Sequence, residues 1–244
     1  MLEQIITCKK RKLKKISTIV YLRSLKKRIL NAPLPKDFKG GLKREKGQRI
    51  NIIAEIKRAS PSKGIIAADF NPRKTALEYE RAGAAAVSVL TEEKYFLGSL
   101  MHLHEVRSIC DLPILRKDFI IHPVEIYEAR AYGADAVLLI VKVLDNKSLK
   151  ELLNLTRELG MQALVEIHSE RELKLALEAG AEIIGINNRN LEDFTIDFGV
   201  TERLVQLIPK DAAAVSESGI KNAQDVRFLE SLGVDAVLIG ETLM

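Results

Sequence analysis

One short pattern occurs four times along the chain and restricts the fold more than any other feature. In each copy a glycine follows a stretch with helical spacing, and an apolar run begins two or three residues later. A glycine in this place is typical of the left-handed residue that ends a helix, and the apolar run is typical of a buried strand. Each copy therefore predicts a joint between a helix and the strand after it. The four glycines are Gly83, Gly133, Gly180 and Gly233.

Short apolar runs alternate with longer amphipathic stretches from residue 51 onward. We expect strands at 51–57, 85–90, 112–117, 135–141, 162–167, 182–187, 212–217 and 235–240, and helices near 71–82, 99–110, 122–131, 146–159, 169–179, 199–207 and 221–231. This alternation is typical of a parallel sheet covered by helices, and eight strands favour closure into a barrel. The predicted fold class is α/β, a (β/α)8 TIM barrel over 51–244. With 244 residues, one domain overall is expected.

Residues 1–50 are predicted to be an N-terminal helix and a linker. They hold 16 Lys and Arg against 3 Asp and Glu, whereas the whole chain has a net charge of +5. Because Leu2, Ile5, Ile6, Leu13 and Ile16 recur at near-helical spacing, we interpret the lysines as the solvated face of an amphipathic helix. Nucleic-acid binding and a general attraction for anionic substrates are the alternatives.

At the other end, Met244 follows Gly240 by four residues, where an eighth helix is expected. The last helix is therefore predicted to be missing or truncated, which would leave the outer, apolar side of the last strand uncovered.

Several classes of protein do not fit the composition. No apolar run reaches the 18 or more residues of a membrane span, and the basic N-terminus lacks the apolar stretch of a secretory signal. Cys8 and Cys110 offer neither a disulfide framework nor metal-ligand spacing. We expect a cytoplasmic protein, a monomer or weak homo-oligomer, with a small-molecule substrate and no nucleic-acid or membrane partner.

Charged and amide side chains stand at the carboxyl ends of several predicted strands. Charges placed there are costly unless they meet a ligand or one another, so they predict one active site. A structural salt bridge is the alternative for the closely spaced pair Glu55 and Lys57. The others are Lys117, Glu166, Asn187 and Glu217.

Two glycine-containing turns, Ser218-Gly219-Ile220 and Gly240-Glu241-Thr242, follow the seventh and eighth predicted strands. In TIM barrels this position commonly binds phosphate through backbone N–H groups, although simple chain turning is the alternative. No Gly-rich dinucleotide fingerprint or P-loop is present. The sequence thus predicts proton chemistry on an anionic substrate, with Lys as acid and Glu as base, and no metal or organic cofactor.

Six segments together resemble indole-3-glycerol phosphate synthase. The resemblance runs in unbroken order from the N-terminal helix to Met244, and its first segment is specific to that enzyme among phosphate-binding barrels. The segments are Ile53-Ala-Glu-Ile-Lys-Arg-Ala-Ser-Pro-Ser62, Leu90-Thr-Glu-Glu-Lys-Tyr-Phe-Leu-Gly-Ser99, Leu115-Arg-Lys-Asp-Phe119, Leu164-Val-Glu-Ile-His168, Ile184-Gly-Ile-Asn-Asn-Arg-Asn-Leu191 and Val215-Ser-Glu-Ser-Gly-Ile220.

The resemblance implies conversion of 1-(2-carboxyphenylamino)-1-deoxyribulose 5-phosphate into indole-3-glycerol phosphate, CO₂ and water, in tryptophan synthesis. It implies that Lys117 is the general acid of ring closure, that Glu166 serves the ring nitrogen, and that Lys57 and Glu55 act in dehydration. The N-terminal helix and linker would cover the barrel mouth.

The same resemblance assigns residues to substrate binding. Asn187, Arg189 and Ser218 would orient the substrate, and Ser60, Gly219 and Gly240 would help to hold it, with Glu217 in the same site. Phe119, Leu138 and Leu191 are candidates for the wall against the aromatic ring, with a place in the core as the alternative. The charge of Glu241 is expected to point away from the phosphate. A catalytically impaired fragment of the synthase and a barrel like phosphoribosylanthranilate isomerase remain as alternatives.

Overall fold

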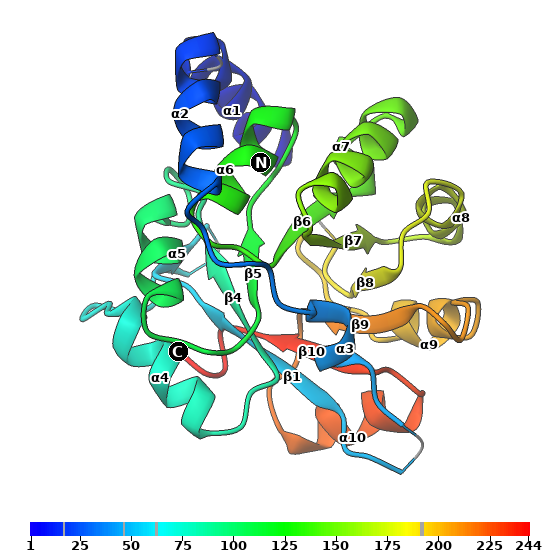
Figure 1. The fold of residues 1–244 in the computed structure, drawn as a ribbon. Coiled ribbons are helices and arrows are strands. Elements are labelled where there is room, and N and C mark those ends of the chain that lie inside the picture. Colours follow the sequence, from blue (N-terminus) through cyan, green and yellow to red (C-terminus); the bar gives the residue numbers. More distant parts are fainter. Residues whose placement is uncertain (17, 46, 62, 191–192) are drawn as a thin grey trace.

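The computed structural model describes residues 1–16, 18–45, 47–61, 63–190 and 193–244. Its centre is a closed barrel in which every neighbouring pair of strands is parallel, as Figure 1 shows. The predicted TIM barrel is confirmed, and each strand lies within two residues of its expected limits. The barrel strands are β1 (Asn51–Ile56), β4 (Ala86–Leu90), β5 (Ile114–Lys117), β6 (Ala136–Ile140), β7 (Gln162–Ile167), β8 (Ile183–Asn187), β9 (Ala213–Glu217) and β10 (Ala236–Ile239).

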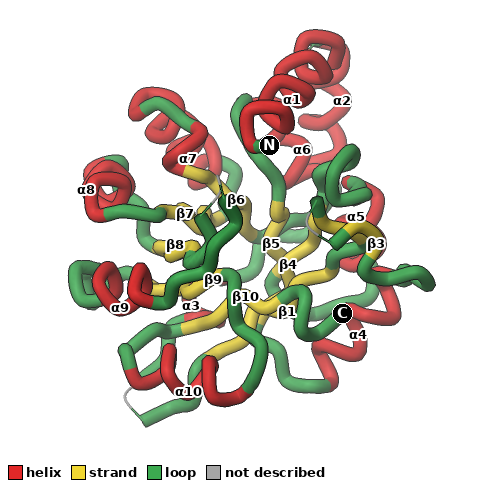
Figure 2. The backbone as a smooth tube through the Cα atoms, turned by 180° about the vertical axis from the view of Figure 1, so that it is seen from behind, coloured by secondary structure: helices red, strands yellow, loops and turns green. Residues whose placement is uncertain are grey.

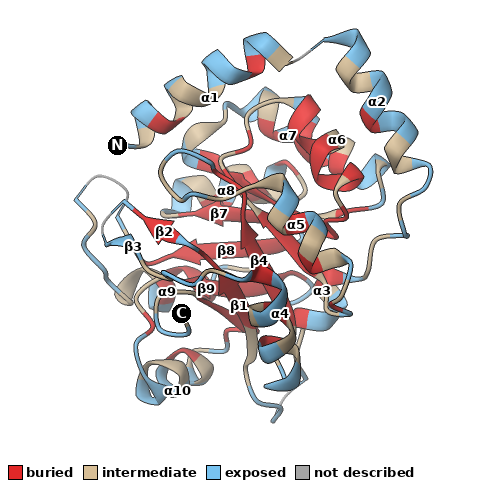
Figure 3. Cartoon of the chain, turned by 90° about the vertical axis from the view of Figure 1, so that its left-hand side faces the viewer, coloured by how far each residue is buried: buried red, intermediate tan, exposed pale blue. Residues whose placement is uncertain are grey.

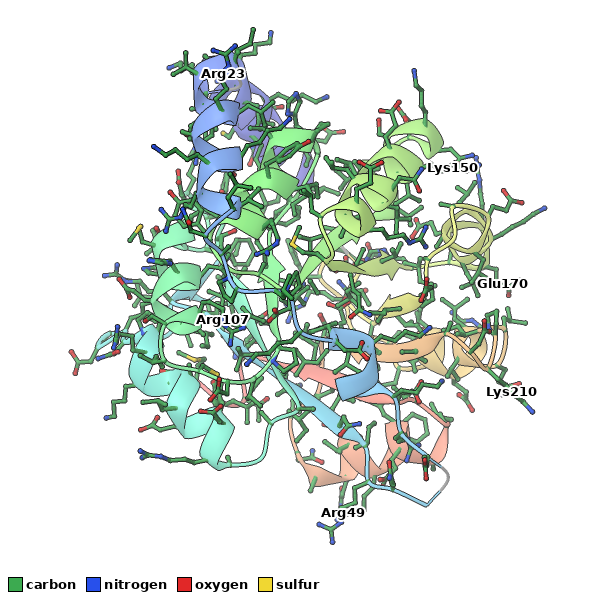
Figure 4. The ribbon with its side chains drawn as sticks, in the orientation of Figure 1. Arg23, Arg49, Arg107, Lys150, Glu170 and Lys210 are labelled. Atoms are coloured by element: carbon green, nitrogen blue, oxygen red, sulfur yellow. The ribbon has the colours of Figure 1, made fainter. Side chains whose placement is uncertain are left out.

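The predicted helices surround the strands (Figure 2). The four joint glycines have φ between +84° and +91°, the left-handed conformation that glycine adopts without strain. Gly160, with φ +76°, makes a fifth joint that the pattern search missed. The outer helices are α4 (Pro72–Arg81), α5 (Leu100–Arg107), α6 (Pro123–Ala131), α7 (Asn146–Glu158), α8 (Glu170–Glu178), α9 (Gly199–Val205) and α10 (Ala223–Ser231). Charged side chains such as Lys150, Glu170 and Lys210 point outward from this layer (Figure 4).

Two apolar layers hold the barrel together because side chains alternate along each strand. Ile53, Leu115 and Leu164 belong to the core inside the barrel, whereas their neighbours Ala54 and Ile114 pack in the layer between strands and helices. The strands are buried on both faces, as Figure 3 shows. The same alternation turns the charged residues at the strand ends toward the barrel axis.

The N-terminal segment is more structured than the expected helix and linker. It contains α1 (Leu2–Ile16), α2 (Ile19–Ile29) and α3 (Phe38–Leu42), with the Thr18 hydroxyl accepting a hydrogen bond from Tyr21 N at the start of α2. In the expected linker, α3 lies in front of the strands in Figure 1. Phe38 and Leu42 are fully buried in the inner core.

The short helix α3 closes the amino-terminal end of the barrel. Lys39 N donates to Gln162 Oε1 at the start of β7, and Asn51 Nδ2 at the start of β1 donates to Leu42 O. Part of the segment expected over the mouth therefore lies at the opposite end.

The loops at the carboxyl ends of the strands hold two further short elements. β2 (Ala59–Ser60) and β3 (Gly64–Ile65) pair as a hairpin after β1, and the 3₁₀ turn η1 (Val141–Val143) follows β6. Neither element has a periodic sequence signal.

After β10 the chain turns, with Leu243 N and Met244 N both donating to Gly240 O. We expected apolar surface to remain uncovered on this strand, and that expectation is wrong. Val237 and Ile239 are only 0% and 6% exposed. They share a core with Tyr79 of α4 and Leu229 of α10, and Met244 packs against it. None of the described helices has the length and apolar character needed to cross a membrane.

Candidate active site

The carboxyl ends of the strands surround a cavity of about 300 Å³. It brings together fourteen of the residues predicted from the sequence, which come from seven different barrel strands or the loops after them. Leu191, predicted for the apolar wall, lies outside the described residues. The lining residues that were predicted are Glu55, Lys57, Ser60, Lys117, Phe119, Leu138, Glu166, Asn187, Arg189, Glu217, Ser218, Gly219, Gly240 and Glu241.

Glu55 and Lys57 form a buried ion pair beside β10, with 2.6 Å between Glu55 Oε1 and Lys57 Nζ. Burial alone would raise the pKa of Glu55, but the positive charges of Lys57 and Lys117 outweigh it and the pKa lies below its ordinary value. The pair needs a glycine at position 240, because a Cβ there would lie 2.3 Å from Glu55 Oε1. The pair is therefore a salt bridge and also lines the cavity, so the two interpretations of Glu55 and Lys57 from the sequence do not exclude each other.

Lys117 lies between two other carboxylates of the same cavity. Its Nζ is 3.3 Å from Glu217 Oε2 and 3.6 Å from Glu166 Oε2. Burial would lower the pKa of Lys117, but the two carboxylates raise it above its ordinary value, so Lys117 is an ammonium at neutral pH. Gly185 on β8 leaves room for this cluster, since a Cβ there would lie 2.2 Å from Glu217 Oε1.

Glu217 is a carboxyl group whose surroundings raise its pKa. Burial, helped by the negative charges of Glu166 and Glu55, raises the pKa of Glu217 to about 7, although Lys117 opposes the shift. The cavity therefore contains a permanent cation and a carboxyl group that can gain or lose a proton near neutral pH. Groups of this kind suit general acid–base chemistry.

The predicted phosphate end has an unusual backbone. Ser218 and Gly219 are both left-handed, with φ of +69° and +85°. A left-handed serine is uncommon and is found mostly where the surrounding structure imposes it, often at functional sites.

Glu241 lines the cavity at this end, and its carboxylate lies 3.1 Å from Lys63 Nζ and 3.4 Å from Arg189 NH2. That its charge points away from the phosphate stays a prediction. Two cations beside the glycine turns attract this carboxylate, which the sequence alone did not reveal.

The lysine-rich helix α1 contributes directly to the mouth of the barrel. Met1, Leu2 and Ile5 line the cavity. Lys9 Nζ lies 2.6 Å from both Asp118 Oδ1 and Glu125 Oε1, and its side chain is only 11% exposed. Lys9 is therefore an exception to the predicted solvated face, and it docks α1 beside Lys117.

Sequence reasoning missed several lining residues in the loops, among them Lys63, Phe96, Phe194 and Ile196. Phe96 lies within a segment that was quoted for the family resemblance, and this was the only available signal for it. The described residues contain no group of three or more His, Cys, Asp or Glu side chains arranged to hold a metal ion.

A closed parallel barrel with ammonium and carboxylate groups at the carboxyl ends of its strands defines a TIM-barrel enzyme built for acid–base chemistry. A family model described as indole-3-glycerol phosphate synthase matches residues 2–244. The chain belongs to this family, whose members are carboxy-lyases of tryptophan biosynthesis acting on a phosphorylated small molecule.

Individual relatives agree with the family assignment. The indole-3-glycerol phosphate synthase of Acetivibrio thermocellus is 51% identical over 246 residues, which cover 100% of this chain and 94% of the relative. That of Dehalococcoides mccartyi strain 195 is 51% identical over 247 residues, with the same coverage. These matches favour the synthase over the isomerase-like alternative.

Among solved structures, the N-acetylmannosamine-6-phosphate 2-epimerase from Clostridium perfringens is similar with a TM-score of 0.64. The match covers 80% of this chain and 87% of that one, at 16% sequence identity. At this identity the likeness shows the shared fold alone.

Proposed function

We propose that this chain converts 1-(2-carboxyphenylamino)-1-deoxyribulose 5-phosphate into indole-3-glycerol phosphate, CO₂ and water. The observation that carries the proposal is the position of Lys117 between Glu166 and Glu217, in the same cavity as the Glu55–Lys57 pair. The reaction closes a carbon–carbon bond, loses carboxylate and then loses water. It therefore needs proton donors and acceptors at two successive stages, and two such groups of residues are available.

In the first stage a carbon of the aromatic ring attacks the substrate ketone, and negative charge develops on the ketone oxygen. Lys117 remains an ammonium because its pKa is raised, so it can stabilise this oxygen and donate a proton to it. Attack by the ring leaves positive charge toward the ring nitrogen, and the Glu166 carboxylate balances it. Glu217 binds the Lys117 ammonium and directs it into the cavity.

In the second stage the closed ring loses CO₂ and then its new hydroxyl group as water. Lys57 donates the proton that lets the hydroxyl leave, and Glu55 accepts a proton from the ring system. Their 2.6 Å contact allows a proton to be shared between the two side chains. This division of labour uses each ion pair for one stage.

Binding is proposed for the remaining lining residues. Asn187 Oδ1 accepts a hydrogen bond from Arg189 N, which fixes the amide where it can orient the substrate. The phosphate is placed against the Ser218-Gly219 and Gly240 turns, near Arg189 and Lys63. Phe119 and Leu138 line the cavity and are the proposed wall for the aromatic ring.

The test is steady-state kinetics of Lys117→Met and Glu166→Gln, which keep side-chain size but remove the charge. Loss of a general acid or base lowers kcat by about 10²- to 10⁴-fold, with a smaller change in KM. Lys150→Met on the exterior of α7 is the matched control. If Lys117→Met or Glu166→Gln kept more than about half of the wild-type kcat, the role proposed for that residue would be wrong. The wild-type kcat itself tests the alternative of an impaired synthase.

A further inference from the structure

His168 is a buried, titratable residue to which the reaction scheme gives no role. It follows β7 directly, two residues after Glu166, and its side chain is 15% exposed. Its Nε2 lies 3.6 Å from Glu166 Oε1 and its Nδ1 lies 3.4 Å from Glu172 Oε2. Among the described residues, Nε2 has no hydrogen-bond partner and almost no exposure to solvent.

Glu172, in the first turn of α8, holds His168 in place. Glu172 Oε2 accepts a hydrogen bond from His168 N at 2.7 Å, so backbone and ring meet the same carboxylate. The Ser169 hydroxyl accepts a hydrogen bond from Glu172 N and caps the helix. The ring is therefore fixed by a regular element outside the cavity, and its free edge is directed toward Glu166.

A neutral imidazole cannot satisfy both neighbours. It carries one N–H, so one of its nitrogens would present a lone pair to a carboxylate oxygen. Only the imidazolium offers an N–H to Glu166 and to Glu172 together. Burial would lower the pKa of His168, but Glu172 and Glu166 raise it above its ordinary value.

Other charges around this group point the same way. Glu217 of β9 adds negative charge near His168. The nearby cations act on the carboxylates: Lys117 of β5 pairs with Glu166, and Lys142 of η1 lies near Glu172.

We propose that His168, held as an imidazolium by Glu172, is a positioning residue that orients the Glu166 carboxylate and supplies its second cation. The inference rests on the role proposed above for Glu166. With His168 at Oε1 and Lys117 at Oε2, Glu166 is held from both sides. Glu166 then stays in place while Lys117 transfers its proton to the substrate.

The protonation state can be measured without substrate. Long-range ¹H–¹⁵N spectra of ¹⁵N-histidine-labelled protein distinguish the imidazolium from both neutral tautomers, and the signal that disappears in His168→Gln identifies residue 168. The chain has 4 histidines, so the spectrum is simple. At pH 6.5, the ordinary pKa of a histidine, we expect the signals of both ring nitrogens to lie mainly at imidazolium positions. A neutral, single-tautomer ring at that pH would overturn the proposal.

Kinetics test the consequence. A displacement of about 1 Å in a catalytic group costs about 10²-fold, so His168→Gln and Glu172→Gln should each lower kcat by about 10- to 100-fold with KM nearly unchanged. His104→Gln, on the exposed side of α5, is the control and should keep wild-type kcat. In His168→Gln, the high-pH decline in kcat that comes from loss of the imidazolium proton should disappear.

The outcomes separate this inference from the proposed function. If Glu166→Gln loses activity and His168→Gln does not, the role of His168 is refuted and that of Glu166 stands. If Glu166→Gln retains activity, the role proposed for Glu166 is refuted, and the role of His168, which depends on it, is refuted with it.

Discussion

Replacing Gly240 by alanine tests whether the end of β10 is shaped for the Glu55–Lys57 pair or only for phosphate. The added Cβ would lie 2.3 Å from Glu55 Oε1 and 3.0 Å from Lys57 Nζ. Ordinary contact begins near 3.4 Å, so the carboxylate must retreat by about 1 Å. Glu55 is buried and ion-paired, and any such retreat moves it relative to the substrate.

The expected size follows from this displacement. Misplacing a catalytic group by about 1 Å costs about 10²-fold in rate, or about 2.7 kcal/mol of transition-state stabilisation. The loss should appear in kcat. If Gly240 served only to let phosphate approach the backbone, the alanine would instead raise KM and weaken phosphate binding.

The assay is steady-state kinetics, with formation of indole-3-glycerol phosphate followed by absorbance, together with thermal unfolding. Gly41→Ala in α3 is the matched control, because its Cβ would meet neighbours only at 3.7 Å, at the other end of the barrel. Combining Gly240→Ala with Glu55→Ala removes the carboxylate that makes the closest clash. In the Glu55→Ala background, Gly240→Ala should lower kcat hardly any further, because the effects of two residues in contact are not additive.

Two results would refute the reasoning. A Gly240→Ala enzyme with wild-type kcat would show that the pair does not need this space. Full additivity with Glu55→Ala would show that the alanine acts through something other than the Glu55 carboxylate.

Three further changes test the electrostatics of the mouth. Lys9→Met leaves two buried carboxylates without their ammonium and should lower the free energy of unfolding by about 3–5 kcal/mol. The control Lys12→Met breaks a pair whose side chains are 47% and 57% exposed, and it should lower the free energy of unfolding by at most about 1 kcal/mol. Equal losses for the two variants in urea titrations would contradict this prediction. The pKa of Glu217 rises from about 4.5 to about 7 on folding, so the native state binds this proton more tightly, and wild-type stability should fall as pH rises through that window. Glu217→Gln should remove that part of the fall in thermal melts, and a parallel pH dependence in both proteins would count against the shift. Glu241→Gln removes the carboxylate that pairs with Lys63 and Arg189, so inorganic phosphate should bind about 2- to 5-fold more tightly. Calorimetry measures this affinity. Unchanged or weaker binding would show that the two cations do not contact the phosphate.

The barrel could be predicted because its signals are local. Glycines such as Gly83 and Gly180 take left-handed φ angles that other residues adopt only with strain. The apolar period then identifies strands and helices, and the two-residue alternation directs Glu55, Lys117 and Glu166 to one side of their strands. Charges at the carboxyl ends of parallel strands must meet at one end of a closed barrel. Most of the charged groups of the cavity were therefore available from the sequence.

Tertiary structure decided which of these groups pair and where the aperiodic segments lie. Nothing in the sequence near Phe38 places α3 at the amino-terminal end of the barrel, and a lysine-rich helix does not reveal that the Lys9 side chain is only 11% exposed and pairs with Asp118. The Glu241 carboxylate faces Lys63 only because two loops far apart in sequence converge. Pairing of charges depends on distances across the barrel, and those are set when the strands close into a ring. Local periodicity fixes the direction of a side chain along its own strand, but its partners come from other strands and loops.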